Sequence, residues 1–286
     1  MPQSASQPDE YLLGHSANEE ERLRRQPGEL EPDSRRLLDR LNIRPGDRAI
    51  DIGCGPQGIL DLLSERVGAN GKVVGLERSE PTVRLARQFI AEHSLRNVEV
   101  LQGDARATGL PRASFDLVHA RLVLVNVPEP QRVVEEMIDL ARPGGVVASH
   151  EADWGAFLCD PPSPSWDRLQ EVFEAYSRNN GIDLFVGRKT HRMFRAAGLI
   201  DIQVNPVIHL YPPGNNRRNI LCDFLENVRD RVLAEGLMTE TEFHKRLTEL
   251  RCHLDDTDTL VISHLFVQVW GRKPKETGVA EPRARV

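Results

Sequence analysis

The amino-acid sequence predicts an α/β fold: a doubly wound, mostly parallel seven-stranded sheet with helices on both faces, N-terminal helices, and a helical cap inserted around the last strands. Two observations carry this prediction. From Asp47 onward, short apolar runs bounded by turn residues alternate with longer stretches whose apolar residues recur at helical spacing. A glycine-rich segment directly follows the first of these runs. Because parallel neighbours need a crossover connection, this alternation indicates a parallel sheet.

Five strands and three helices account for the first half of the pattern. The predicted strands are 48–53, 72–77, 98–103, 115–121 and 146–151. The predicted helices are 59–67, 79–93 and 130–142, the last closed by a turn at Pro143-Gly144-Gly145.

The regular alternation stops after the fifth strand. The remaining predicted elements are a Pro-rich turn, helices over 166–179 and 188–197, a strand over 200–211, helical segments over 218–256 and a strand over 263–273. The helical stretch between the last two strands is too long for a simple turn. We therefore expect it to form a lid.

At the N-terminus, a charged helix from Ser16 is expected to end at Pro27 and Gly28, and a second short helix to cover 33–41. The polar segments 1–8 and 273–286 are expected to be flexible tails. The rest, 9–272, is expected to form one domain. Its core would comprise about 44–151, 188–211 and 263–272, and its cap about 9–42, 152–187 and 212–258.

Composition limits the function classes. The chain has 286 residues, 40% hydrophobic and 28% charged, which is ordinary for a globular protein and argues against general disorder. The formal net charge is −6 and no long block of one sign occurs, so nucleic acid is not expected as a partner.

The cysteines and the apolar runs indicate location. Four widely separated cysteines form no CxxC pair, so neither a zinc site nor a disulfide framework is expected, and a reducing cytoplasm fits. The N-terminus lacks a basic region followed by an apolar run, and no later segment approaches about 18 uninterrupted apolar residues. We expect a cytoplasmic protein that does not enter a membrane.

The strongest motif is the segment DIGCGPQG at 51–58. It places Asp51 at the end of the first strand, Cys54 within the turn, and Gly53, Gly55 and Gly58 at GxGxxG spacing. Glycines allow a tight turn and close approach of a ligand, and the helix that follows supplies free N–H groups. An ordinary glycine-rich turn is the structural alternative.

Acidic residues follow the next two strands. Glu77, followed by Arg78, ends the second strand, where a carboxylate can accept hydrogen bonds from ribose hydroxyls. Such a residue serves NAD and S-adenosylmethionine alike, and it can also be a solvated charge. Gly103, Asp104 and Ala105 follow the third strand, and Asp104 could accept a hydrogen bond from an adenine amine, which a pyrophosphate-binding dehydrogenase does not require.

Together, the segments DIGCGPQG, VVGLER, GDA, FDLVHAR and LARPGG resemble class I (Rossmann-like) S-adenosylmethionine-dependent methyltransferases, especially the small-molecule branch, over about residues 11–155. The resemblance implies S-adenosylmethionine as cofactor and S-adenosylhomocysteine as product. It implies that the glycine loop holds the methionine part, Glu77 the ribose and Asp104 the adenine. It also places Arg121, at the end of the fourth strand, and Tyr11, in a closing N-terminal helix, beside the cofactor.

Two departures from related families are informative. The Asn/Asp-Pro-Pro-aromatic motif of enzymes that methylate bases is absent after the fourth strand, where HARLVLVNVP stands instead. Asp160-Pro161-Pro162 lies later and is interpreted as a loop. No cluster of oxygen and nitrogen ligands suggests a metal.

A general base is needed only if the methyl acceptor must lose a proton. The candidates near the strand ends are His119, Glu151 and Asp153, the last two on one side of a continuing strand. They could equally be caps and loop charges. Four aromatic residues could line an acceptor pocket, although a place in the core is the commoner role: Trp154, Phe173, Phe185 and Tyr211. His191, His209 and His264 are interpreted as packing or surface residues.

Three functions remain open. The leading one is methylation of an oxygen or nitrogen, less readily a carbon, of a small molecule such as a secondary metabolite. The second is a protein that binds S-adenosylmethionine for a non-methylating reaction or for regulation. The third, an NAD-dependent oxidoreductase, is disfavoured by Asp104 and by the lack of a Tyr-x-x-x-Lys pair. Segments 154–187 and 212–258, together with the N-terminal helix, are expected to form a movable cap, and a homodimer interface is the alternative use of 212–258.

Overall fold

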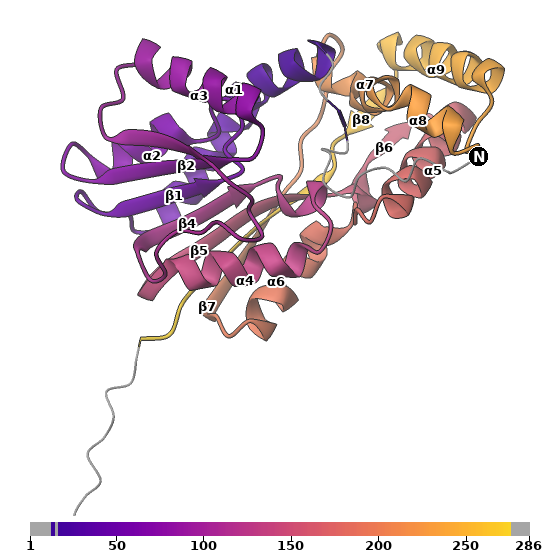
Figure 1. Ribbon diagram of the computed structural model, residues 1–286. Coiled ribbons are helices and arrows are strands. Elements are labelled where there is room, and N and C mark those ends of the chain that lie inside the picture. The colour runs from indigo at the N-terminus through magenta and orange to yellow at the C-terminus, as the bar shows by residue number, and fades with distance from the viewer. Residues whose placement is uncertain (1–12, 15–16, 276–286) are drawn as a thin grey trace, which may run out of the picture.

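A computed structural model describes residues 13–14 and 17–275. Its centre is a seven-stranded sheet in the order β3-β2-β1-β4-β5-β9-β7 (Figure 1). The strands are β1 (Arg48–Ile52), β2 (Lys72–Glu77), β3 (Val98–Gln102), β4 (Phe115–Arg121), β5 (Ala141–Asp153), β7 (Ile200–Val207) and β9 (Leu265–Arg272). The first five are parallel, and β9 runs antiparallel to both of its neighbours. The predicted fold class is confirmed.

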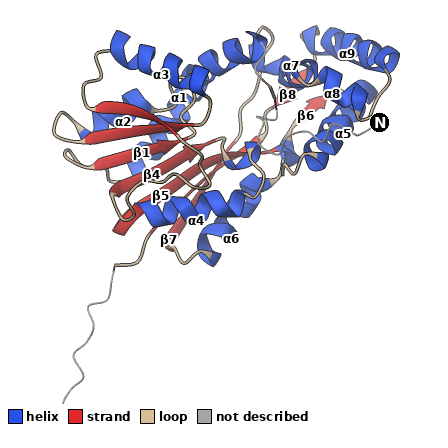
Figure 2. Cartoon of the chain, viewed as in Figure 1, coloured by secondary structure: helices blue, strands red, loops and turns tan. Residues whose placement is uncertain are grey.

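Helices cover both faces of this sheet (Figure 2). On one face lie α2 (Leu60–Val67) and α3 (Glu80–Glu92); on the other lie α4 (Pro130–Leu140) and α6 (Val186–Ala196). Side chains alternate along β1, so that Ala49 belongs to the core beneath α2 and α3 while Ile50 belongs to the core beneath α4 and α6. Burial on both faces explains the nearly continuous apolar runs of these strands.

The prediction of two N-terminal helices is wrong. One continuous helix, α1 (Ala17–Arg40), contains Pro27 and Pro32. Its buried positions continue at helical spacing across both prolines, through Pro27, Leu30, Asp33 and Leu37. Packing along that stripe thus outweighs the hydrogen bonds that the prolines remove.

The turn predicted at 143–145 is also wrong, because β5 already begins at Ala141 and includes these residues. The pairing of β4 with β5 shifts register between Phe115 and Leu117. A Cβ on Gly145 would lie 2.9 Å from the Arg142 carbonyl oxygen and 3.0 Å from that of Phe115. The glycine therefore permits the strand to continue through a local irregularity.

A cap stands beyond the carboxyl end of β5 (Figure 1). It contains the helices α5 (Pro164–Asn179), η3 (Asn216–Asn219), α7 (Ile220–Asn227), α8 (Arg229–Ala234) and α9 (Glu240–Asp255), with short 3-10 helices η1 (Leu124–Asn126) and η2 (Trp154–Ala156) beneath. The strands β6 (Leu158–Asp160) and β8 (Leu260–Ile262) form a separate antiparallel pair. The strand expected over 200–211 ends at Val207, and Leu210 bridges to Ile262 instead.

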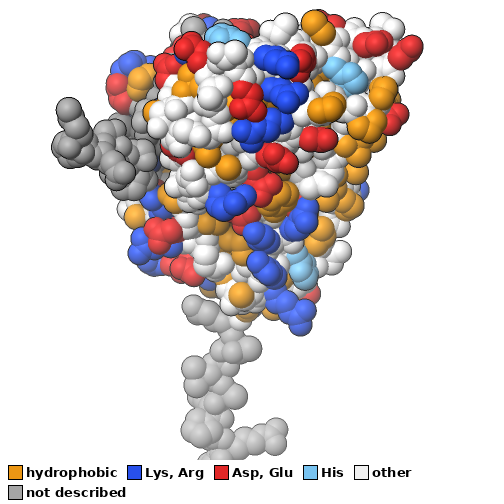
Figure 3. Space-filling model, turned by 90° about the vertical axis from the view of Figure 1, so that its right-hand side faces the viewer, with side chains coloured by type: hydrophobic (Ala, Val, Ile, Leu, Met, Phe, Trp, Pro, Cys, Tyr) orange, Lys and Arg blue, Asp and Glu red, His pale blue; other side chains and the backbone are white. Residues whose placement is uncertain are grey.

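Side chains of both charge signs are interspersed on the outer face of the cap (Figure 3). Among the helices of the described part of the chain, none is long and apolar enough to cross a membrane.

Candidate active site

The glycine loop follows β1, and its three glycines do different things. All have positive φ, +63° at Gly53, +58° at Gly55 and +57° at Gly58. A Cβ on Gly58 would lie 2.2 Å from Asp51 Oδ2, and one on Gly53 would lie 2.6 Å from Val123 Cγ2, whereas one on Gly55 would meet no atom of the described residues within 4 Å. Gly53 and Gly58 therefore allow close packing, and Gly55 leaves open space for a ligand.

Buried polar residues behind the loop hold its shape. Asp51 accepts a hydrogen bond from the backbone N–H of Ile59 at 3.1 Å, and its other oxygen lies 2.7 Å from His119 Nδ1. Arg121 donates to the Gly58 carbonyl and to Ser34 Oγ, both at 3.0 Å, and burial lowers its pKa to about 10. Burial raises the pKa of the Cys54 thiol well above its usual range, so this cysteine stays uncharged.

A cavity of about 270 Å³ opens beside Gly55 at the carboxyl ends of β1, β2 and β3. Seven of the predicted cofactor residues line it: Gly53, Gly55, Glu77, Arg78, Gly103, Asp104 and Ala105. Asp51, Cys54, Gly58 and Arg121 lie behind the wall rather than in it. Tyr11 lies outside the described residues.

The two acidic residues of this cavity are held in place. Glu77 accepts hydrogen bonds from the backbone N–H groups of Gly55, at 3.1 Å, and Ser79, at 2.8 Å. Asp104 accepts from the backbone N–H of Arg106 at 2.8 Å and from its guanidinium at 2.7 Å. The side-chain hydrogen bond from Arg106 lowers the pKa of Asp104, so a charged acceptor faces the cavity.

The three candidate bases are engaged elsewhere. Glu151 is fully buried and accepts from the backbone N–H groups of residues 123–125 at 3.1 to 3.2 Å, and burial raises its pKa to about 7. Asp153 is paired with Arg188 and accepts from the N–H of Gly155. His119 is held by Asp51. Alternation places Glu151 and Asp153 on one side of β5 as expected, but none of the three candidates lines a cavity.

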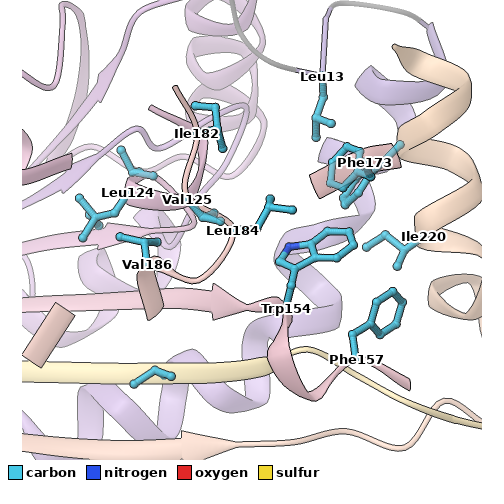
Figure 4. Packing of buried hydrophobic residues seen from close by; sticks show 14 of the residues in the cluster. Leu13, Leu124, Val125, Trp154, Phe157, Phe173, Ile182, Leu184, Val186 and Ile220 are labelled. Atoms are coloured by element: carbon cyan, nitrogen blue, oxygen red, sulfur yellow. The ribbon is translucent and has the colours of Figure 1, made fainter. Parts of the chain in front are cut away.

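A second, smaller cavity of about 50 Å³ lies beneath the cap. Five of its lining residues carry aromatic rings: Trp154, Phe173, Phe224, Phe266 and His264. Trp154 lies between Leu184, Phe173 and Ile220, with Leu13 facing it across the space (Figure 4). Asn126, at the end of η1, lines both cavities, so the two spaces adjoin.

Comparison with known proteins shows the family to which this chain belongs. Residues 43–198, more than half of the chain, match a family described as a methyltransferase domain. A demethylmenaquinone methyltransferase of Geobacillus stearothermophilus is 32% identical over 182 residues, which are 59% of this chain and 78% of that enzyme. The chain belongs to the methyltransferase family.

Two further similarities extend over more of this chain. A 37.1 kDa protein of transposon TN4556 in Streptomyces fradiae is 32% identical over 209 residues, 71% of this chain and 57% of that protein. This chain thus spans less than two thirds of that relative. Haemonchus contortus phosphoethanolamine N-methyltransferase 2, solved with phosphomonomethylethanolamine and S-adenosylhomocysteine, shares the fold at a TM-score of 0.55 and 18% identity, over 85% of this chain and 53% of that one.

The predicted family and enzyme class, S-adenosylmethionine-dependent methyltransferases, are therefore confirmed, as is S-adenosylmethionine as the cofactor of the family. The larger cavity of this methyltransferase fits that cofactor. Gly55 leaves the space that a Cβ would fill, and Glu77 and Asp104 supply acceptors at the ends of two successive strands.

Sequence reasoning about the smaller cavity of this methyltransferase was only partly right. Trp154 and Phe173 line it, whereas Tyr211 and Phe185 lie at other depressions. His264, interpreted as a packing or surface residue, lines it as well. The only signal for His264 is a polar ring next to an apolar strand, which is too common to single out a site.

Proposed function

We propose that this chain transfers the methyl group of S-adenosylmethionine to an oxygen or nitrogen, less readily a carbon, of a small molecule held beneath the cap. The observation that carries the proposal is the junction of the two cavities at Asn126. The cofactor supplies an electrophilic methyl group on a sulfonium. The chain's part is to hold the acceptor on the axis of that methyl group and to exclude water.

The predicted cofactor residues form two groups: those that contact the cofactor and those that hold the glycine loop in shape. Glu77 and Asp104 hold ribose and adenine, with the other five lining residues around them. Asp51, Gly58 and Arg121 act through the loop, because they bond to its backbone or pack against it.

No general base is assigned. His119, Glu151 and Asp153 each bond to another part of the chain and lie outside both cavities, which supports positioning roles for them. An acceptor that is a neutral amine, or that is already ionised, needs no base before transfer.

The remaining proposals concern organisation and surroundings. The core and cap are one domain, with the cap movable over the acceptor, and residues 212–258 supply either that cap or a homodimer contact. The net charge of −6 supports a small-molecule substrate rather than nucleic acid. Four cysteines without a disulfide framework support the cytoplasm.

Calorimetry with S-adenosylhomocysteine and with NAD tests the cofactor assignment. Binding of the first and not of the second is expected. Glu77→Ala should weaken binding by about 1–3 kcal/mol, because it removes a carboxylate that holds both the ligand and Gly55. Glu80→Ala, three residues away and exposed, is the matched control and should leave affinity unchanged. Equal affinities for the two variants would remove Glu77 from the site.

Mass spectrometry with S-adenosylmethionine and a panel of small phenols, amines and quinols, including reduced demethylmenaquinone, tests the transfer. A product heavier by one methyl group, together with S-adenosylhomocysteine, is expected. Tight cofactor binding without transfer to any acceptor would favour the non-methylating alternative.

A further inference from the structure

His264 lies between β8 and β9, lines the smaller cavity and is 3% exposed. Neither of its ring nitrogens has a hydrogen-bond partner among the residues that the structure describes. A buried polar group left unpaired costs free energy, so native proteins rarely retain one without a reason.

Aromatic neighbours fix the ring of His264. It stacks on Phe157 with centroids 4.2 Å apart and an interplanar angle of 22°, and it meets Trp154 at 4.3 Å and 65°. Phe266 stands edge-on at 6.0 Å. Because rings pack against it on several sides, the imidazole is held in one orientation beside the cavity.

The imidazole is uncharged. Burial lowers the pKa of His264 to about 3, and the positive charge of the nearby Arg217 contributes to the lowering. A neutral imidazole presents one donor and one acceptor nitrogen. A hydroxyl group can pair with either of them, because it donates and accepts.

The rest of the wall disfavours a cationic acceptor. Of the described residues lining this cavity, two carry positive charge, Arg22 and Arg217, and none is a carboxylate. The two arginines pair with Glu19 and Glu29, which lie outside the wall. An ammonium group would therefore find no counter-charge here, whereas a flat apolar body would find Trp154.

We propose that His264 binds the hydroxyl group of the methyl acceptor, and that the acceptor is an aromatic ring carrying at least one hydroxyl. This inference rests on the proposed function, because it assigns the smaller cavity to the acceptor. His264 is a binding and positioning residue here.

The size of the cavity adds a condition. A space of about 50 Å³ is smaller than the roughly 150 Å³ cavity that accommodates benzene in other proteins. Phe173 on α5 and Phe224 on α7 belong to the cap, so their displacement widens the cavity when an acceptor enters.

Phenol and toluene are the probes, because they match in shape and differ by a hydroxyl in place of a methyl group. Dissociation constants are measured by NMR titration of the full chain saturated with S-adenosylhomocysteine. In His264→Phe, the preference for phenol over toluene should fall about 10-fold relative to the native chain, since the stacking is retained and the hydrogen bond is lost. His264→Asn should recover part of the preference.

Two controls accompany the titration. His244→Phe, at an exposed position of α9, should keep the native preference. Affinity for S-adenosylhomocysteine should stay within about twofold in His264→Phe, since Asn126 and not His264 borders the cofactor cavity. An unchanged preference in His264→Phe, or no binding of phenol to the native chain, overturns the proposal.

A measurement on the native chain guards against a variant that fails to fold. The imidazole nitrogen resonances of His264 should shift on addition of phenol and not of toluene. No shift with phenol overturns the proposal. Failure of the proposed function looks different: phenol would still bind at His264, while no acceptor would be methylated or S-adenosylhomocysteine would not bind.

Discussion

The two adjoining cavities are built in different ways. The cofactor cavity is formed largely by the ends of β1, β2 and β3 and by the segments that follow them, between Gly53 and Arg106. The smaller cavity beneath the cap, called the aromatic cavity below, is lined by residues from α1, β5, α5, α7 and β9, among others, which are far apart in the sequence. A site built at strand ends around a tight glycine turn restricts its residue types, whereas a site built from the side chains of distant elements can change its specificity while the fold stays the same.

The largest expected effect tests the cofactor cavity. Gly55→Val should abolish S-adenosylhomocysteine binding, because the new side chain would fill open space in the cavity and strain a φ of +58°. Calorimetry measures the loss, and circular dichroism checks that the sheet remains folded.

Gly46→Val is the matched control for that variant. Gly46 also has positive φ, +94°, with open space around it, but it precedes β1 and lies outside the cofactor cavity. The Gly46→Val variant should have a lower free energy of unfolding and an unchanged affinity for S-adenosylhomocysteine. Equal loss of binding in both variants would mean that strain, and not occupancy of the cavity, is responsible.

The next effect tests whether the cap depends on one buried side chain. Arg218 is 3% exposed and donates to four backbone carbonyls, those of Tyr211, Leu254, Asp256 and Thr259. Arg218→Met leaves these carbonyls without that partner and should lower the free energy of unfolding by about 3 kcal/mol.

Hydrogen exchange should show that the loss in Arg218→Met falls first on residues 240–260, while the ends of β1 to β3 stay protected. Arg178→Met is the control, because Arg178 is exposed and pairs with Glu174 in the preceding turn of the same helix. Uniform loss of protection across the molecule would contradict a separate cap unit.

The smallest effect compares two buried histidines, one behind the cofactor cavity and one in the wall of the smaller cavity. His150 lies near Arg121, behind the glycine loop, and His264 lies in the aromatic cavity. Burial lowers the pKa of each to about 3. Since the folded pKa is below the unfolded value of about 6.5, each contributes stability above that pH and loses it as the pH falls toward 3.

As the pH falls below about 6.5, each histidine should therefore lower the free energy of unfolding by about 1.4 kcal/mol per pH unit. Denaturant unfolding at several pH values measures this slope, and His150→Leu should reduce it by one such contribution. Glu151 has the opposite effect on stability, because its raised pKa of about 7 means that its contribution to stability is lost as the pH rises. The quantity to compare is therefore the difference in slope between His150→Leu and the native chain. His244→Leu, at an exposed site, should leave the slope unchanged.

The sequence by itself determined the sheet and the cofactor loop. Apolar runs at strand length, helical spacing between them and the GxGxxG turn ahead of Glu77 and Asp104 are local patterns. Such patterns follow from backbone geometry, which is why seven of the predicted residues line one cavity. Even here, the sequence did not separate the residues that line the wall from Asp51 and Arg121, which support it.

Only the tertiary structure decided the rest. Packing made α1 one helix through Pro27 and Pro32, and it turned Glu151 toward backbone N–H groups and Asp153 toward Arg188, away from both cavities. His264 gained its place because β9 lies beside β5, which brings its ring against Trp154. Contacts between residues about a hundred positions apart leave no periodic trace in the sequence, because they depend on how the elements pack and not on local conformation.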